Sequence, residues 1–282
     1  MPEIWKIPMQ EQIRLMQTGE LRVEDVATVY LERLQRYGRK DGLNVLAQAN
    51  PHVLEEARAL DAQADKSGAL FGLPILVKDN MDVQGLRTTA GSFALGDNKA
   101  KCDAPVIANL RKAGALILGK ANMTEFANYT SPEMPNGYSS YGGQVIHAYD
   151  RAKDPSGSST GSAVAVSAGL CAAAIGTDTS FSIVGCAMEN GVTGLKPGHS
   201  SLSGAGIVPI ARLLDSAGTI TRTFGDALRI YYAMRGGASI PVQAADVRQL
   251  RLKVNTVNRE MQSETQRGLC QDLLEKLHNA GA

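Results

Sequence analysis

The sequence predicts an α/β protein with a mixed, largely buried sheet that is covered by helices. Short apolar runs after residue 70 alternate with stretches of helical periodicity, which is typical of strands and helices built into one domain. The runs are almost wholly apolar, so we expect both faces of the sheet to be covered. A chain of 282 residues, 44% of them apolar, is long enough to bury such a core.

The first 68 residues are predicted to be helical. Apolar side chains recur at helical spacing in residues 13–16, 26–34 and 53–60. Gly19 follows the first of these stretches and Gly38 the second, at positions where glycine commonly ends a helix.

Residues 69–245 are predicted to form the core of the domain. The apolar run 73–77 predicts a buried strand that stops at Lys78, and residues 115–118 predict another. Residues 106–113 between them predict a helix, and a further helix is expected to start near Thr124. The segment 131–162 is rich in Ser, Gly, Pro and Asn and predicts a long loop, which is uncommon unless it is functional.

The second half of this core continues the alternation. Residues 163–175 are apolar and small, which predicts a helix buried on most sides, and a polar turn follows at 176–183. Short apolar runs at 191–195 and 206–210 and a helix at 224–234 complete the pattern.

The remaining residues, 246–282, are predicted to begin a C-terminal part of the same domain. A strand is expected at 252–254 and a final helix at 265–279. Residues 1–282 are therefore predicted to form a single domain.

Composition excludes several classes of protein. The net charge is +1 and the basic residues are scattered, so neither nucleic acid nor an acidic membrane is an expected partner. Four cysteines without a C-x-x-C pair predict reduced thiols and no metal site. We also expect no cofactor. The N-terminus lacks the apolar core of a signal peptide, and no apolar run is long enough to span a membrane, so we expect a cytoplasmic protein.

Three polar positions stand out among small residues. Lys78 ends a strand, residues 157–162 lead into an apolar helix, and residues 176–182 follow that helix. Each also has a plain structural explanation: a strand-end charge, a helix N-cap and a polar turn. Residues 157–161 also fit G-x-S-x-G, the nucleophile elbow of α/β-hydrolases, but the polar residues before them do not form the hydrophobic strand that this elbow requires.

Taken together, several long motifs in the correct order make the chain resemble the amidase signature family from about residue 10 to residue 254. The matching segments are GLPILVKDN (72–80), TTAGS (88–92), DAPVIANLRKAGALILGKANMTEFA (103–127), SGSSTGSAVAVSAGL (156–170), GTDTSFSI (176–183), GVTGLKP (191–197) and GIVPIARLLDSAGTITRTFGDAL (206–228). The resemblance implies the amidase signature fold in a shortened form, and a small-molecule amide as substrate.

Carried over residue by residue, the resemblance also implies a catalytic triad. Ser182 corresponds to the nucleophile, Ser158 to the bridging serine and Lys78 to the base. The backbone N–H groups of Thr179, Ser180, Phe181 and Ser182 would form the oxyanion hole. Ser159 and Asp178 would support this network, although a helix cap and a turn-forming aspartate explain them equally well.

These residue types suit amide hydrolysis. A serine hydroxyl is a weak nucleophile until a base removes its proton, and a lysine is a base only when burial keeps its amine neutral. A second serine between them can relay the proton, because a hydroxyl both donates and accepts hydrogen bonds.

The chain departs from the family pattern in three places. Ser180-Phe181 replaces two glycines, so either the loop uses ordinary backbone dihedrals or the oxyanion hole is altered. Ile183 to Cys186 replaces the pattern I-R-x-P, and the missing arginine favours a less charged substrate. Family members commonly continue well beyond residue 282, so we expect a naturally short member, a fragment, or a subunit that needs a partner, with homodimerisation as one remedy.

Three functions are therefore considered. The first is an amidase that hydrolyses small carboxamides through an acyl-serine intermediate. The second is the amidase-like subunit of a glutamyl- or aspartyl-tRNA amidotransferase-type complex. The third is a catalytically degenerate binding module, which the Ser180-Phe181 change would favour.

Overall fold

The structure is a computed structural model that describes residues 3–237, 246–251, 253 and 262–282. The chain divides into two compact units, Met1–Ile240 and Pro241–Ala282, which are described separately. The strand predicted at 252–254 lies outside the described residues, since both of its end residues are undescribed.

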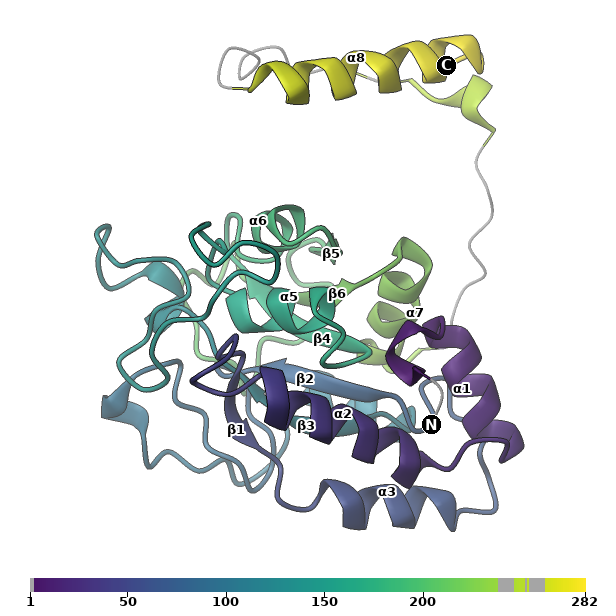
Figure 1. Cartoon of the computed structure of the whole chain (residues 1–282), viewed down its shortest axis with the longest axis vertical. Coiled ribbons are helices and arrows are strands. Elements are labelled where there is room, and N and C mark those ends of the chain that lie inside the picture. Colours follow the sequence, from purple (N-terminus) through teal and green to yellow (C-terminus); the bar gives the residue numbers. More distant parts are fainter. Residues whose placement is uncertain (1–2, 238–245, 252, 254–261) are drawn as a thin grey trace. The chain divides into compact units, whose positions relative to one another are not determined.

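The first unit is built on a six-stranded sheet (Figure 1). Its strands are β1 (Leu46–Ala49), β2 (Pro74–Lys78), β3 (Leu116–Ala121), β4 (Ala173–Asp178), β5 (Thr193–Leu195) and β6 (Ser216–Thr221), in the spatial order β1-β3-β2-β4-β6-β5. β2 runs parallel to β3 and β4, whereas the pairs β1–β3, β4–β6 and β5–β6 are antiparallel. Every residue of β2, β3, β4 and β6 is buried. The prediction of a mixed, largely buried sheet is confirmed.

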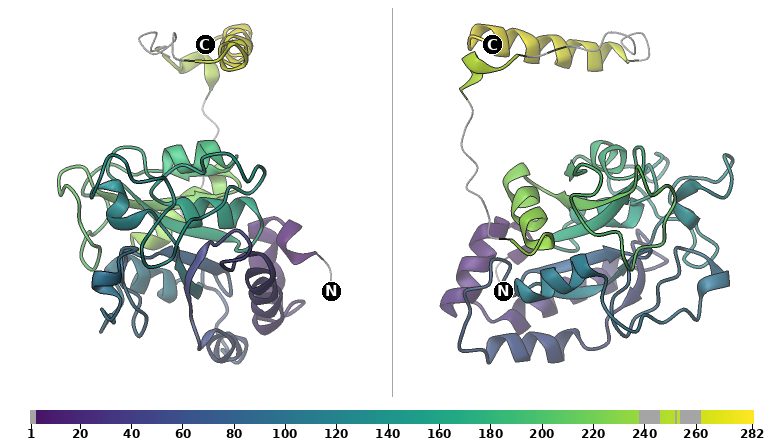
Figure 2. Two further views of the ribbon diagram at one scale, coloured as in Figure 1. Left: turned by 60° about the vertical axis from the view of Figure 1, so that its left-hand side comes forward. Right: turned by 180° about the vertical axis from the view of Figure 1, so that it is seen from behind.

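Helices cover both faces of this sheet (Figures 1 and 2). The α-helices are α1 (Met9–Thr18), α2 (Val23–Tyr37), α3 (Val53–Asp61), α4 (Pro105–Lys112), α5 (Thr160–Ser167), α6 (Val184–Glu189) and α7 (Phe224–Met234). Short 3-10 turns lie at Ile4–Lys6, Phe93–Leu95 and Glu125–Asn128. The helices α5 and α2 contact β2 from one face, and α4 packs with α7 on the other. The three N-terminal helices, α4 and α7 lie where the sequence predicts them.

The helix predicted over residues 163–175 is wrong in its second half. The helix α5 ends at Ser167, Gly169 takes a left-handed φ of 64°, and the chain returns as β4 from Ala173. Glycine adopts that conformation without strain, so it ends the helix in the middle of the apolar run. The small side chains of β4 then lie between two other strands and under α5.

The helix expected near Thr124 is also wrong. Residues Glu125–Asn128 form only a 3-10 turn, inside which Phe126 and Ala127 have φ of 42° and 55°. Tertiary bonds replace helical ones here, because the N–H of Phe126 donates to Ala90 and that of Glu125 to Tyr138. The run 206–210 is not a strand either, since it makes a single bridge between Met81 and Ile207.

The second unit contains a 3-10 turn at Val247–Gln249 and the helix α8 (Glu264–Asn279). Ser263 and Gln266 form a reciprocal capping box at its start, which fixes where the helix begins. The predicted final helix is confirmed. No helix in the described part of the chain is both long enough and apolar enough to cross a membrane.

Candidate active site

The ends of β2 and β4 and the start of α5 meet at one edge of the sheet. β2 and β4 are parallel neighbours, so their carboxyl ends lie together, with Lys78 closing one strand and Asp178 the other. The helix α5 begins at Thr160, directly after Ser158 and Ser159. The loop after β4 then carries Ser182 back toward the start of α5, where the N–H of Ser159 donates to the carbonyl of Ser182 at 3.2 Å.

Three side chains form a continuous polar chain at this edge. Lys78 Nζ lies 2.7 Å from Ser158 Oγ, and Ser158 Oγ lies 3.0 Å from Ser182 Oγ. Lys78 and Ser158 are fully buried, whereas Ser182 is partly accessible. The peptide bond between Gly157 and Ser158 is cis. The structure thus joins a buried amine to an accessible hydroxyl through a second hydroxyl.

Burial makes Lys78 an unusual lysine. It lowers the pKa of the Lys78 ammonium to about 7, and the more distant carboxylates of Asp178 and Asp215 offset only part of this effect. No carboxylate forms a salt bridge with Lys78 in the described part of the chain. The amine is therefore substantially neutral near physiological pH.

Two further acceptors hold the Lys78 amine. Nζ lies 3.0 Å from Ser159 Oγ and 3.3 Å from the carbonyl oxygen of Thr177. The Ser159 hydroxyl itself donates to the same Thr177 carbonyl at 3.0 Å. Gly176 makes this approach possible, because a Cβ there would lie 2.7 Å from Ser159 Oγ.

Asp178 holds the loop that contains Ser182. Its Oδ2 accepts hydrogen bonds from the N–H groups of Ile183 at 2.7 Å and Val184 at 3.2 Å, at the start of α6. None of the backbone N–H groups of residues 179–182 donates to another described residue. The loop before Ser182 therefore has backbone N–H groups that are not used by other described residues.

The two residues that replace glycines fit this loop without strain. Neither Ser180 nor Phe181 has a positive φ. The Phe181 ring is half exposed and lies against Gly185, where a Cβ would come within 2.0 Å of the ring. Where the family pattern has two glycines, the backbone of this loop therefore uses ordinary dihedrals, which is one of the two alternatives expected from the sequence.

A cleft of about 620 Å³ adjoins the site. Asn80, Thr177 and Thr179 line it, together with residues between His199 and Ala217. Asp215 links two of the segments that line this cleft. Its carboxylate accepts hydrogen bonds from Thr179 Oγ1 at 2.6 Å and from the N–H of Ile210 at 2.9 Å. The cleft is large enough for a small organic ligand.

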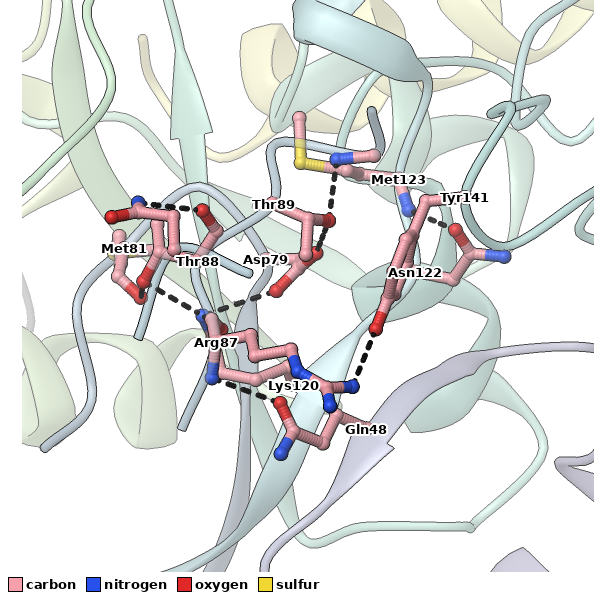
Figure 3. Close-up of polar contacts among 12 residues, drawn as sticks. Gln48, Asp79, Met81, Arg87, Thr88, Thr89, Lys120, Asn122, Met123 and Tyr141 are labelled. Carbon is pink, nitrogen blue, oxygen red and sulfur yellow. Dashed lines mark hydrogen bonds and ion pairs between the residues drawn. The ribbon is translucent and has the colours of Figure 1, made fainter. Parts of the chain in front are cut away.

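Sequence reasoning missed a buried ion pair between Lys120 and Asp79, the residue that follows Lys78 (Figure 3). Lys120 on β3 places its Nζ 3.1 Å from Asp79 Oδ1, and both side chains are buried. Lys120 also donates to the carbonyl of Arg87 at 2.8 Å, and the Thr89 hydroxyl donates to Asp79. Burial raises the pKa of Asp79 and lowers that of Lys120, while each charge favours the ionised form of the other.

Removing one member of this pair is expected to destabilise the first unit strongly. Asp79→Asn or Lys120→Met leaves a charge buried without its partner, which typically lowers the free energy of unfolding by about 3–5 kcal/mol. Urea unfolding followed by circular dichroism measures this. The double variant is expected to lose less than the sum of the two single losses; additive losses would show that the two charges do not act as a pair.

No group of three or more His, Cys, Asp or Glu side chains in the described residues could hold a metal ion. The buried thiols of Cys171 and Cys186 have pKa values raised by burial, to about 11 for Cys186, so they are unreactive as nucleophiles.

The known proteins that this chain resembles include amidases and amidotransferase subunits. A family model described as "Amidase" matches residues 25–267. A probable amidase of Arabidopsis thaliana is 37% identical over 256 residues, which cover 83% of this chain and 50% of the relative. A glutamyl-tRNA(Gln) amidotransferase subunit of Symbiobacterium thermophilum is 39% identical, over 79% of this chain and 45% of that protein.

Solved structures agree. The native peptide amidase of Stenotrophomonas maltophilia superposes with a TM-score of 0.85 and 34% identity, covering 98% of this chain and 61% of that one. A glutamyl-tRNA(Gln) amidotransferase subunit of Thermotoga maritima gives a TM-score of 0.68 at 29% identity, over 87% and 51% of the two chains. The chain spans half or less of the length of the curated relatives it matches.

Proposed function

Because this chain belongs to the amidase family, we propose that it hydrolyses the C–N bond of a small linear carboxamide through an acyl-serine intermediate. The observation that carries the proposal is the chain of contacts from Lys78 through Ser158 to Ser182, with distances of 2.7 and 3.0 Å. We assign Ser182 as the nucleophile, Ser158 as the proton relay and Lys78 as the base.

In the first step, Ser182 Oγ forms a bond to the carboxamide carbon while its proton passes to Ser158 Oγ. Ser158 gives its own proton to the Lys78 amine, so the net result is an oxyanion and a lysine ammonium. The lowered pKa of Lys78, about 7, matches the base to a neutral working pH.

We assign Ser159 the task of orienting the Lys78 amine. A neutral amine has two N–H donors and one lone pair, and Ser159 Oγ and the Thr177 carbonyl are placed to accept from the two donors. Ser159 Oγ can accept because its own proton goes to the Thr177 carbonyl. The remaining lone pair then faces Ser158, at 2.7 Å.

The oxyanion would be held by backbone N–H groups among Thr179, Ser180, Phe181 and Ser182, which have no acceptor among the described residues. Asp178 positions these donors by fixing the start of α6. Loss of one such donor typically lowers kcat by about 10²–10³-fold.

Collapse of the tetrahedral intermediate breaks the C–N bond. The leaving nitrogen takes a proton from Ser158, which is replenished from the Lys78 ammonium, and ammonia or an amine departs. Water then repeats the sequence on the acyl-serine, giving the carboxylate and restoring Ser182. No cofactor enters this scheme, and a cytoplasmic location and a homodimer stay predictions.

The amidase-like subunit of an amidotransferase complex is the second candidate, because the identity to the amidotransferase subunit of Symbiobacterium thermophilum is 39%. We rank it lower since the structural similarity to such a protein is weaker, with a TM-score of 0.68 against 0.85 for the peptide amidase. Ammonia release that requires added partner proteins would favour it.

The deciding experiment measures ammonia released from a panel of primary amides, beside labelling with a fluorophosphonate. We expect turnover, with label on Ser182, and a preference for neutral amides over amides that carry a carboxylate, because Val184 stands where the family pattern has arginine. Preference for the amides that carry a carboxylate would contradict the expected substrate preference. Arg212, which lines the cleft, would then be the candidate to bind that carboxylate. A folded protein that is neither labelled nor active would be a binding module.

A further inference from the structure

We infer that Asn80 determines specificity for amides, by accepting a hydrogen bond from the N–H of the leaving nitrogen through its carbonyl Oδ1. The inference rests on the proposed function, since it concerns the same carboxamide bound beside Ser182. It begins with a buried polar atom that has no partner among the described residues.

Asn80 lies two residues after Lys78, just past the end of β2, and only 3% of its surface is exposed. Its side-chain Nδ2 donates to Thr177 Oγ1 at 3.0 Å. Its Oδ1 is buried and has no hydrogen-bond partner in the described part of the chain. Nearly all buried carbonyl oxygens are paired, because an unpaired one loses its contact with water and gains no hydrogen bond in return. Such an atom points to a missing donor.

Two hydrogen bonds hold Asn80 in place, and one of them is to Thr177, which also contacts Lys78. The backbone carbonyl of Asn80 accepts from the N–H of Val208 at 2.9 Å, and its amide is held by Thr177, whose own carbonyl accepts from Lys78. Thr177 therefore fixes both the base and Asn80. Asn80 lines the large cleft and also a smaller one of about 70 Å³.

The chemistry of a carboxamide identifies the missing donor. Its carbonyl oxygen needs donors, which the N–H groups of residues 179–182 would supply. Its nitrogen offers only N–H groups, so it needs an acceptor. An amide carbonyl such as Asn80 Oδ1 accepts and cannot donate.

An ester of the same acid separates this role from a merely structural one, because its leaving oxygen carries no N–H. We compare a primary amide and the methyl ester of one acyl group, using wild type, Asn80→Leu, which is nearly isosteric, and Asn80→Ala. In both variants we expect kcat/KM for the amide to fall about 10–100-fold and that for the ester to stay within about 3-fold of wild type.

Asn190 provides a matched control. It is also buried with an unpaired Oδ1 among the described residues, but its Nδ2 donates to the carbonyls of Pro155 and Cys186, away from the cleft residues. Asn190→Ala is expected to leave the ratio of amide to ester turnover unchanged.

Two outcomes count against the inference, and they are distinct. Equal losses on amide and ester in the Asn80 variants, with fluorophosphonate labelling of Ser182 retained, would overturn the role of Asn80 and leave the hydrolase intact. A folded wild type that cleaves neither substrate would overturn the proposed function itself. If one variant fails to fold, the other gives the same comparison.

Discussion

Replacing Ser182 with alanine is expected to lower kcat for amide hydrolysis by about 10⁶-fold, close to the effect of deleting a serine nucleophile in other serine hydrolases. The reason is that Ser158 and Lys78 are fully buried, so neither can take over attack on a substrate that approaches from the accessible side. Single-turnover assays and mass spectrometry of the trapped acyl-enzyme measure the loss.

The fold should tolerate the change, because the Ser182 hydroxyl is partly accessible and its backbone, not its side chain, bonds to Ser159. The exposed Ser67 gives a control, and Ser67→Ala should keep full activity and labelling. A Ser182→Ala protein that still turned over amide at more than about one per cent of the wild-type rate would identify a different nucleophile.

Much of the fold follows from patterns that are local in the chain. The strand before Lys78 is a continuous apolar run with a charged stop, and α7 has a clear helical period. The sequence does not predict β1 and β6, because β1 has only four residues and β6 mixes glycine and hydroxyl side chains. Their burial comes from neighbours that are distant in sequence, which no window on the chain contains.

Some residues of the site can likewise be predicted from the sequence and others cannot. Lys78, Ser158 and Ser182 can be singled out because they sit in small-residue segments that resemble known motifs. The Asp79–Lys120 pair cannot, since its two residues meet only because β3 lies beside β2 in the sheet order. Asn80 escapes sequence reasoning for a related reason: its unpaired Oδ1 is visible only once Thr177 is known to hold its Nδ2.

The activity of the wild-type protein is expected to rise with pH through about 7 and then level off, because Lys78 must be neutral to accept a proton and burial lowers its pKa to about 7. Below that pH the ammonium cannot act as a base, so kcat/KM should fall about tenfold for each further pH unit. Lys78→Met is expected to lose about 10²–10⁴-fold in kcat and, with it, this pH dependence. A profile measured on an uncharged amide avoids titration of the substrate.

The same lysine also predicts that stability depends on pH, over a higher pH range than activity does. An ordinary lysine has a pKa near 10.5, so between about pH 7 and 10.5 Lys78 binds a proton in the unfolded chain but not in the native protein. The free energy of unfolding of wild type, relative to Lys78→Met, should therefore increase with pH over that window. A difference that stayed constant with pH would mean that the buried amine keeps its proton. In that case Lys78 could not be the base, whatever its distance from Ser158.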